Sequence, residues 1–156
     1  MNIDCEIINA HKQCYKYSCI PSSVEMILKL LKRIEPNDYH LQEHWDNRTN
    51  GSFADFDNKI IKGVTFYQRS NPDAKKLFEI IDKELNEGRF VSISLKIPPN
   101  EDHHMYIIYD YDKDGIDYKA FTKQYQETSK IIIDNVKDKV KSMKDHTTDI
   151  LIYSSG

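Results

Sequence analysis

The sequence lacks the marks of a secreted, disulfide-bonded or membrane-spanning protein. Its three cysteines are odd in number, which argues against a disulfide framework, and in a reducing cytosol they would stay free thiols. No stretch approaches the roughly 18 consecutive apolar residues of a transmembrane helix. The opening residues, MNIDCEIINAHK, lack the basic start and the apolar run of a signal peptide. We therefore expect a cytoplasmic protein without a membrane partner, and a route out of the cell that needs no cleaved signal stays open.

A basic stripe is also missing. Charged residues make up 30% of the 156 residues in mixed sign, and the formal net charge is −3, so nothing favours a nucleic-acid partner. Hydrophobic residues make up 39%, which is below the average for globular proteins but sufficient for folding. No internal repeat or low-complexity linker divides the chain. We expect one domain over residues 1–156, with a core of ordinary size.

Helical periodicity dominates the first part of the chain. Pro21 suits the first turn of a helix, because its missing N–H is not needed there. An apolar stripe at helical spacing follows, and the helix should end before Pro36. The pattern predicts further helices around Trp45, in FADFDNKIIK up to a capping Gly63, and between Asn71 and Gly88.

The pattern then changes to the alternation of strands. RFVSISLKI alternates, HMYIIYDY is a β-rich run followed by the turn residues DKDG, and IDYKAFT is typical of the returning strand of a hairpin. VTFYQR and DILIY also predict strands, whereas SKIII is either a short strand or the lead into a helix over 134–143. Helices come first and an antiparallel sheet follows, which predicts the α+β class.

One cysteine stands where a thiol can become reactive. Cysteine attacks as its thiolate, and a free pKa of about 8.5 leaves little of that form at neutral pH. Cys19 lies just ahead of Pro21, at the mouth of the predicted helix, where unpaired N–H groups favour an anion. Cys5 and Cys14 lack that advantage. A buried structural thiol is the other interpretation of Cys19, because free cysteines are among the most buried residues.

Acyl transfer by a thiolate needs further groups. The backbone N–H of Cys19 can donate to the oxyanion, and the amide of Gln13 is a second candidate donor. His104 stands at the start of a strong predicted strand and could take the thiol proton, and His103 would turn to the opposite face of that strand. A satisfied structural histidine is the other interpretation. We expect no cofactor or metal, because adjacent histidines on a strand diverge and no ligand pair has zinc spacing. His11 and His40 are expected at the surface.

These segments, in order, resemble a family. A Gln stands six residues before the cysteine of YSCIPSSVEMILK, and ELNEGRFVSISL and HHMYIIYDYDKDG follow. The series is similar to papain-like cysteine peptidases of the bacteriocin-leader-processing type and their stand-alone peptidase-like relatives, over about residues 10–122. The resemblance implies a papain-like fold with N-terminal helices packed on an antiparallel sheet. It implies Cys19 as the nucleophile, His104 as the general base and Gln13 as the oxyanion donor.

The chain also departs from that family's pattern. Ile20 replaces the glycine after the nucleophile, and Asp110 replaces the glycine before Tyr-Asp. The family's third catalytic residue is an Asp or Asn 17 to 18 residues after the His, where this chain has Phe121 and Thr122. Because the third residue orients the imidazole, Thr122 or a backbone carbonyl would have to take that part.

The leading hypothesis is therefore a thiol protease or amide hydrolase that acts on a peptide or protein. One alternative is a catalytically inactive relative of these peptidases that binds a peptide or a partner protein in the former substrate-binding groove. Another keeps the Cys–His chemistry but performs deamidation, transglutamination or another acyl transfer. Oligomeric state and pathway are not readable from the residues.

Overall fold

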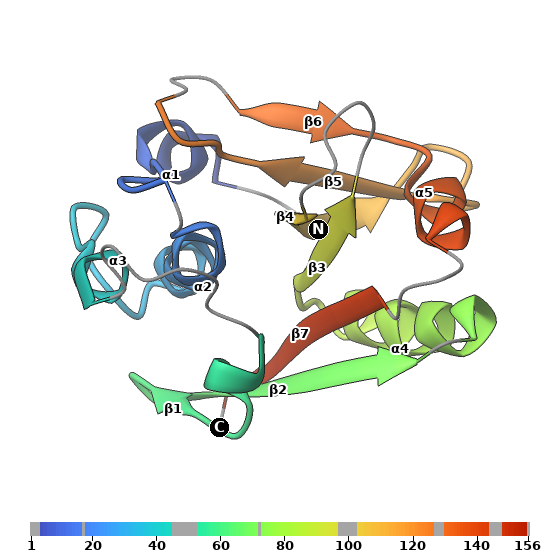
Figure 1. Ribbon diagram of the computed structural model, residues 1–156, viewed down its shortest axis with the longest axis horizontal. Coiled ribbons are helices and arrows are strands. Elements are labelled where there is room, and N and C mark those ends of the chain that lie inside the picture. The colour runs from blue at the N-terminus through green and yellow to red at the C-terminus, as the bar shows by residue number, and fades with distance from the viewer. Residues whose placement is uncertain are drawn as a thin grey trace.

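The helices at the start of the chain begin where the sequence offers helix-start signals. The computed structural model describes residues 4–16, 18–44, 53–71, 73–96, 103–126, 130–143 and 148–155 (Figure 1). Asp4 caps helix α1 (Cys5–Ala10) by accepting from the N–H groups of Glu6 and Ile7. Helix α2 (Cys19–Leu30) carries Pro21 in its first turn, as predicted, and ends well before Pro36. The short α3 (His40–His44) follows, and Trp45 lies outside the described residues.

In the described part of the chain, seven strands form one antiparallel sheet. Its order is β1-β2-β7-β3-β4-β5-β6, so the last strand of the chain is inserted between the second and the third. The alternating segments became strands as predicted, and SKIII became one as well. The strands are β1 (Ile60–Ile61), β2 (Val64–Asn71), β3 (Val91–Lys96), β4 (His103–Tyr111), β5 (Tyr118–Thr122), β6 (Ile131–Ile133) and β7 (Thr148–Ser155).

The predicted helix up to Gly63 is wrong. Phe53–Phe56 form a single 3-10 turn, η1, and the chain then enters β1. Ile60 pairs with Thr65 and Ile61 with Val64, so β1 and β2 form a hairpin. Gly63 has a φ of +80° inside its turn, a conformation that glycine adopts without steric cost. The glycine therefore closes a β-turn and not a helix.

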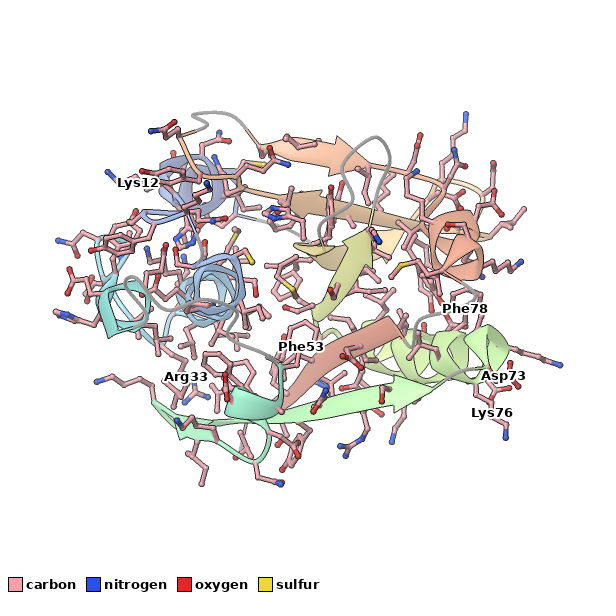
Figure 2. The ribbon with its side chains drawn as sticks, viewed as in Figure 1. Lys12, Arg33, Phe53, Asp73, Lys76 and Phe78 are labelled. Atoms are coloured by element: carbon pink, nitrogen blue, oxygen red, sulfur yellow. The ribbon has the colours of Figure 1, made fainter. Side chains whose placement is uncertain are left out.

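Helices cover both faces of the sheet. Helices α1, α2 and α3 gather on one side of the molecule, while α4 (Ala74–Asn86) and α5 (Val136–Ser142) lie on the other (Figure 1). Phe53 packs in the core between α2 and the sheet. Phe78 is a residue of α4 and packs in the core between α4 and the sheet, whereas Lys76 of the same helix points away from the molecule (Figure 2). The α+β class is confirmed, and α4 and α5 add a second helical layer to the expected N-terminal one.

Strand β4 shows how the two cores are separated. Met105 and Ile107 belong to the core under α2, whereas Tyr106 and Ile108 belong to the core under α4. This alternation follows from the two-residue period of a strand. Among the described residues, no helix is both long and apolar enough to cross a membrane.

Candidate functional site

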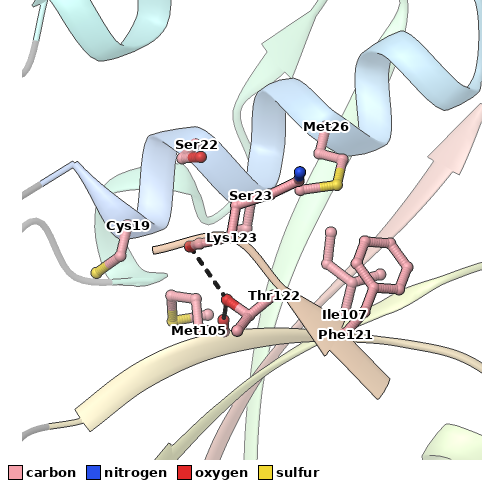
Figure 3. Close-up of a pocket in the computed structure, with 9 residues that line it drawn as sticks. All are labelled: Cys19, Ser22, Ser23, Met26, Met105, Ile107, Phe121, Thr122 and Lys123. Atoms are coloured by element: carbon pink, nitrogen blue, oxygen red, sulfur yellow. Dashed lines mark hydrogen bonds between the residues drawn. The ribbon is translucent and has the colours of Figure 1, made fainter. Parts of the chain in front are cut away.

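Cys19 is the first residue of α2, and it lines a small pocket between that helix and the sheet. Figure 3 shows Cys19 at the start of the helix, with Ser23 and Met26 farther along it and Met105 and Thr122 on the strands that face the helix. Ser18, the residue before the helix, makes no side-chain cap hydrogen bond within the described part of the chain. The N–H groups of the first turn are therefore not occupied by a cap. The pocket is lined by Cys19, Ser22, Ser23, Met26, Met105, Ile107, Phe121, Thr122 and Lys123.

The environment of Cys19 has two opposing effects on its thiol. Burial raises the pKa, while the backbone N–H groups of Cys19 and Ile20 lower it, and burial prevails. The net pKa lies above the ordinary value of a cysteine. The thiolate expected at the helix mouth is therefore not the resting form of Cys19 in this structure, because the helix start is covered by the sheet.

His104 stands near the start of β4, opposite Leu95 of β3. Its ring lies edge-on to Tyr106, and its Nε2 is 2.9 Å from Oγ1 of Thr122 on β5. Burial lowers the pKa of the imidazole, and a hydrogen bond to the backbone of Lys123 opposes that effect. His104 is therefore a neutral base at neutral pH.

Thr122 fixes which nitrogen of His104 carries the proton. The Thr122 hydroxyl has a single hydrogen, and it donates that hydrogen to the carbonyl of Met105. Its oxygen must then accept from His104, so the hydrogen of the imidazole sits on Nε2. Nδ1 is left with its lone pair. This is the arrangement that a general base requires, and here it is produced by a threonine hydroxyl.

Cys19 and Thr122 line the same pocket, and Thr122 contacts His104. Across the described residues, no hydrogen bond connects the Cys19 thiol with the His104 ring. The register of β4 explains the separation, because His104 shares the face of Tyr106 and Ile108, whereas Met105 and Ile107 line the pocket. The backbone of His103 is part of β4, but its side chain lies outside the described part of the structure.

Gln13 is buried in the loop that leads into α2. Its Nε2 donates to the carbonyls of Tyr15 at 2.9 Å and Lys16 at 3.2 Å, and its Oε1 has no hydrogen-bond partner among the described residues. Both amide hydrogens of Gln13 are therefore donated to backbone carbonyls of its own loop. The predicted role in binding an oxyanion requires the amide to turn away from these two carbonyls.

A buried polar cluster behind α2 escaped the sequence reasoning. His11, expected at the surface, is only 1% exposed, whereas His40 is exposed as predicted. Lys29 donates to His11 Nδ1 at 2.9 Å, so Nε2 of His11 carries the hydrogen that is donated to the carbonyl of Ser22. The ammonium of Lys29 also lies 3.7 Å from the ring centroid of Tyr39.

Burial controls the titration of this cluster. It lowers the pKa of His11 to about 3, with help from the charge of Lys29, and it also lowers the pKa of Lys29. It raises the pKa of Glu25 to about 7, against hydrogen bonds from Gln42. The i, i+4 spacing of Glu25 and Lys29 in the sequence was the available signal, because it places both charges on one side of the helix. That these charges are covered by α1 and α3 could not be read from that spacing.

No cation centre emerges from the described ranges, in which no three His, Cys, Asp or Glu side chains are grouped to hold a metal. Models of known protein families give no match to this chain, and no curated protein matches its sequence.

Proposed function

We propose that the protein is a cysteine-dependent amide hydrolase with a papain-like arrangement, acting on a peptide or protein. The observation that carries this proposal is the position of Cys19. It starts an α-helix, it lines the pocket, and the same pocket is lined by the threonine that holds His104 in the base-competent tautomer. A purely structural thiol does not require a pocket lined by a residue that fixes the tautomer of a histidine.

In the proposed reaction, the Cys19 sulfur attacks the carbonyl carbon of the substrate while Nδ1 of His104 removes the thiol proton. The C–S bond forms and the carbonyl electron pair moves to oxygen. Collapse of this intermediate breaks the C–N bond, and the proton on Nδ1 passes to the leaving nitrogen. Water then attacks the thioester with His104 again acting as base, which releases the acid and restores the thiol.

The resting pKa values fit proton transfer during attack better than a preformed ion pair. Burial disfavours both the thiolate and the imidazolium, so the neutral pair is favoured before substrate binds. The oxyanion would receive the N–H of Cys19 and, after its amide turns, Gln13. Substrate binding would also have to bring the thiol and the imidazole into contact, because they make no direct hydrogen bond.

A second candidate function is binding without catalysis. Two observations favour it: the amide of Gln13 is occupied within its own loop, and burial raises the pKa of the Cys19 thiol. In this alternative the pocket holds a side chain of a peptide or partner protein and no bond is broken. Deamidation and other acyl transfer would use the same residues as hydrolysis, with water or another amine as the second reactant.

The deciding experiment treats a peptide library with the protein and follows it by mass spectrometry. Cleavage, a one-dalton deamidation and a cross-link give different masses. If the proposal holds, Cys19→Ala lowers the rate by at least about 1,000-fold, as loss of a nucleophile does, whereas Cys14→Ala has little effect. Equal products from wild type and Cys19→Ala would exclude a catalytic cysteine at this position.

A second pair of variants tests the orientation of the base. Thr122→Ser keeps the hydroxyl that accepts from His104, and Thr122→Val removes it. We expect Thr122→Ser to retain most of the activity and Thr122→Val to lose about 10-fold to 100-fold in kcat, as for other groups that orient a histidine. Equal activities of the two variants would remove Thr122 from the mechanism.

A further inference from the structure

Gln42 of α3 is fully buried, and all four hydrogen-bonding positions of its amide are occupied. Nε2 donates to the carbonyl of Lys12 at 2.9 Å and to Oε1 of Glu25 at 2.7 Å. Oε1 lies 2.6 Å from the N–H of Cys14 and 2.8 Å from Oγ of Ser18. An amide with two donors and two acceptor lone pairs can do no more than this.

These partners surround the loop that carries the proposed site. Lys12 and Cys14 are the two neighbours of Gln13, and Ser18 is the residue before Cys19. One side chain from α3 therefore holds the backbone on both sides of the proposed oxyanion donor and next to the proposed nucleophile. The three partners lie 28, 24 and 30 positions away from Gln42 in the chain. Figure 1 shows α3 beside α2, in agreement with these contacts.

Glu25 in turn fixes Gln42. Its carboxylate accepts from Gln42 Nε2 and from the backbone N–H groups of Leu41 at 2.9 Å and Gln42 at 3.3 Å. The Lys12 carbonyl and the ionised Glu25 carboxylate can only accept, and the Cys14 N–H can only donate. The orientation of the amide is therefore determined by its partners, and neither a flipped amide nor a carboxylate satisfies all of them.

We propose that Gln42 is a positioning residue of the site, which sets the shape of residues 12–18 and thereby the placement of Gln13 and Cys19. This inference builds on the proposed function for its catalytic consequence, but its structural part stands separately. Displacement of a catalytic group by about 1 Å can cost about 100-fold in rate, so a local loosening of this loop would be visible in kcat.

The test compares three variants of the whole chain. Gln42→Met keeps the size of the side chain and removes every hydrogen bond of the amide. Gln42→Glu keeps the size and the acceptor, but it replaces the donating Nε2 with an oxygen that faces the carboxylate of Glu25 and the Lys12 carbonyl. Gln68→Glu, on β2 and three strands away from β4, is the matched control for the change of charge.

Amide hydrogen exchange measured by NMR is the first readout and needs no enzymatic activity. We expect the Cys14 N–H to exchange at least about 10-fold faster in Gln42→Met than in wild type, because its acceptor is gone. The exchange rates of the α4 amides should not change in Gln42→Met, and the exchange rate of the Cys14 N–H should not change in Gln68→Glu. In Gln42→Glu, the Cys14 N–H should lose protection from exchange at neutral pH and regain part of it at acidic pH, where one shared proton restores the hydrogen bond to Glu25. Unchanged exchange at Cys14, or equal acceleration at all amides, overturns the proposal.

Kinetics with a cleaved peptide are the second readout. We expect Gln42→Met to lower kcat by about 10-fold to 100-fold with KM nearly unchanged. The double variant Gln42→Met/Gln13→Ala should have a kcat only slightly below that of Gln13→Ala alone, because Gln42 is proposed to act partly through Gln13. Faster Cys14 exchange with normal kcat would overturn the positioning role. If wild type shows no cysteine-dependent reaction, the proposed function fails, and hydrogen exchange still decides whether Gln42 holds the loop.

Discussion

Helices α2 and α4 are similar in length but meet the protein in different ways. In α4 the buried residues follow one stripe, with exposed lysines and glutamates on the outer side. In α2 every residue from Pro21 to Lys29 is buried, including Glu25 and Lys29. Helix α4 therefore packs on the sheet with one face and exposes the other to solvent. Helix α2 is an internal helix whose polar side is enclosed by α1 and α3. The helix that carries the candidate nucleophile is thus held on all sides.

The apolar faces of the two helices should be equally important for stability. Leu28 on α2 and Leu77 on α4 are both fully buried in their cores. We expect Leu28→Ala and Leu77→Ala each to lower the free energy of unfolding by about 4 kcal/mol, because each leaves a cavity. Urea unfolding measures both. A large cost in only one variant would mean that the two cores are not packed alike.

The polar faces should differ clearly. Lys29→Met removes the donor to His11 and the cation over the Tyr39 ring, and it leaves Glu25 without a nearby positive charge. We expect a loss of about 3 kcal/mol in the free energy of unfolding. Lys83→Met on the exposed side of α4 is the matched control, with an expected change within about 0.5 kcal/mol. Equal effects would mean that the polar side of α2 contributes no more than an exposed surface.

The dependence of stability on pH should separate the two regions further. Because the folded protein holds the pKa of His11 near 3, below the ordinary 6.5, only the unfolded chain takes up a proton between these values. Stability from His11 is therefore present above pH 6.5 and is lost as the pH falls. From pH 8 to pH 5, wild type should lose about 2 kcal/mol relative to His11→Asn. A difference that stays constant with pH would show that folding does not lower the pKa of His11.

The smallest effect concerns the helix starts. Asp73 accepts from the N–H of Lys75 and caps α4, whereas Ser18 makes no such bond to α2 within the described structure. We expect Asp73→Ala to cost about 1 kcal/mol. Ser18→Ala should leave the first-turn amides of α2 unchanged in hydrogen exchange, because its hydroxyl serves the loop and Gln42. Faster exchange in that first turn would reveal a cap at Ser18.

Local patterns predicted those features that depend on neighbours in the chain. Asp73 and Gly88 bracket α4, the alternation in RFVSISLKI and HMYIIYDY produced β3 and β4, and Cys19 begins α2 as its proximity to Pro21 suggested. Gly63 was misjudged because a glycine with positive φ ends helices and closes β-turns alike, and only the pairing of β1 with β2 distinguishes the two.

The candidate site was predicted residue by residue but not in its geometry. The sequence left Thr122 or a backbone carbonyl as the group that would orient His104. The structure has a 2.9 Å contact between Thr122 and His104 and a hydrogen bond from the imidazole to the backbone of Lys123. The resting state of the Cys19 thiol was misjudged, because the helix start alone favours an anion and the covering sheet opposes it. Gln42 carried no recognisable motif, since its partners are distributed over a loop about 30 positions away.

By itself, the sequence determined the α+β class, the start of the helix at Cys19 and most strands, because hydrophobic period, proline and glycine act over a few residues. Tertiary structure alone decided the insertion of β7 between β2 and β3, the burial of His11, Glu25 and Lys29, and the contacts of Gln42 with the loop before α2. These depend on surfaces that meet only after the chain has folded, where desolvation and hydrogen-bond geometry set the charge of each group.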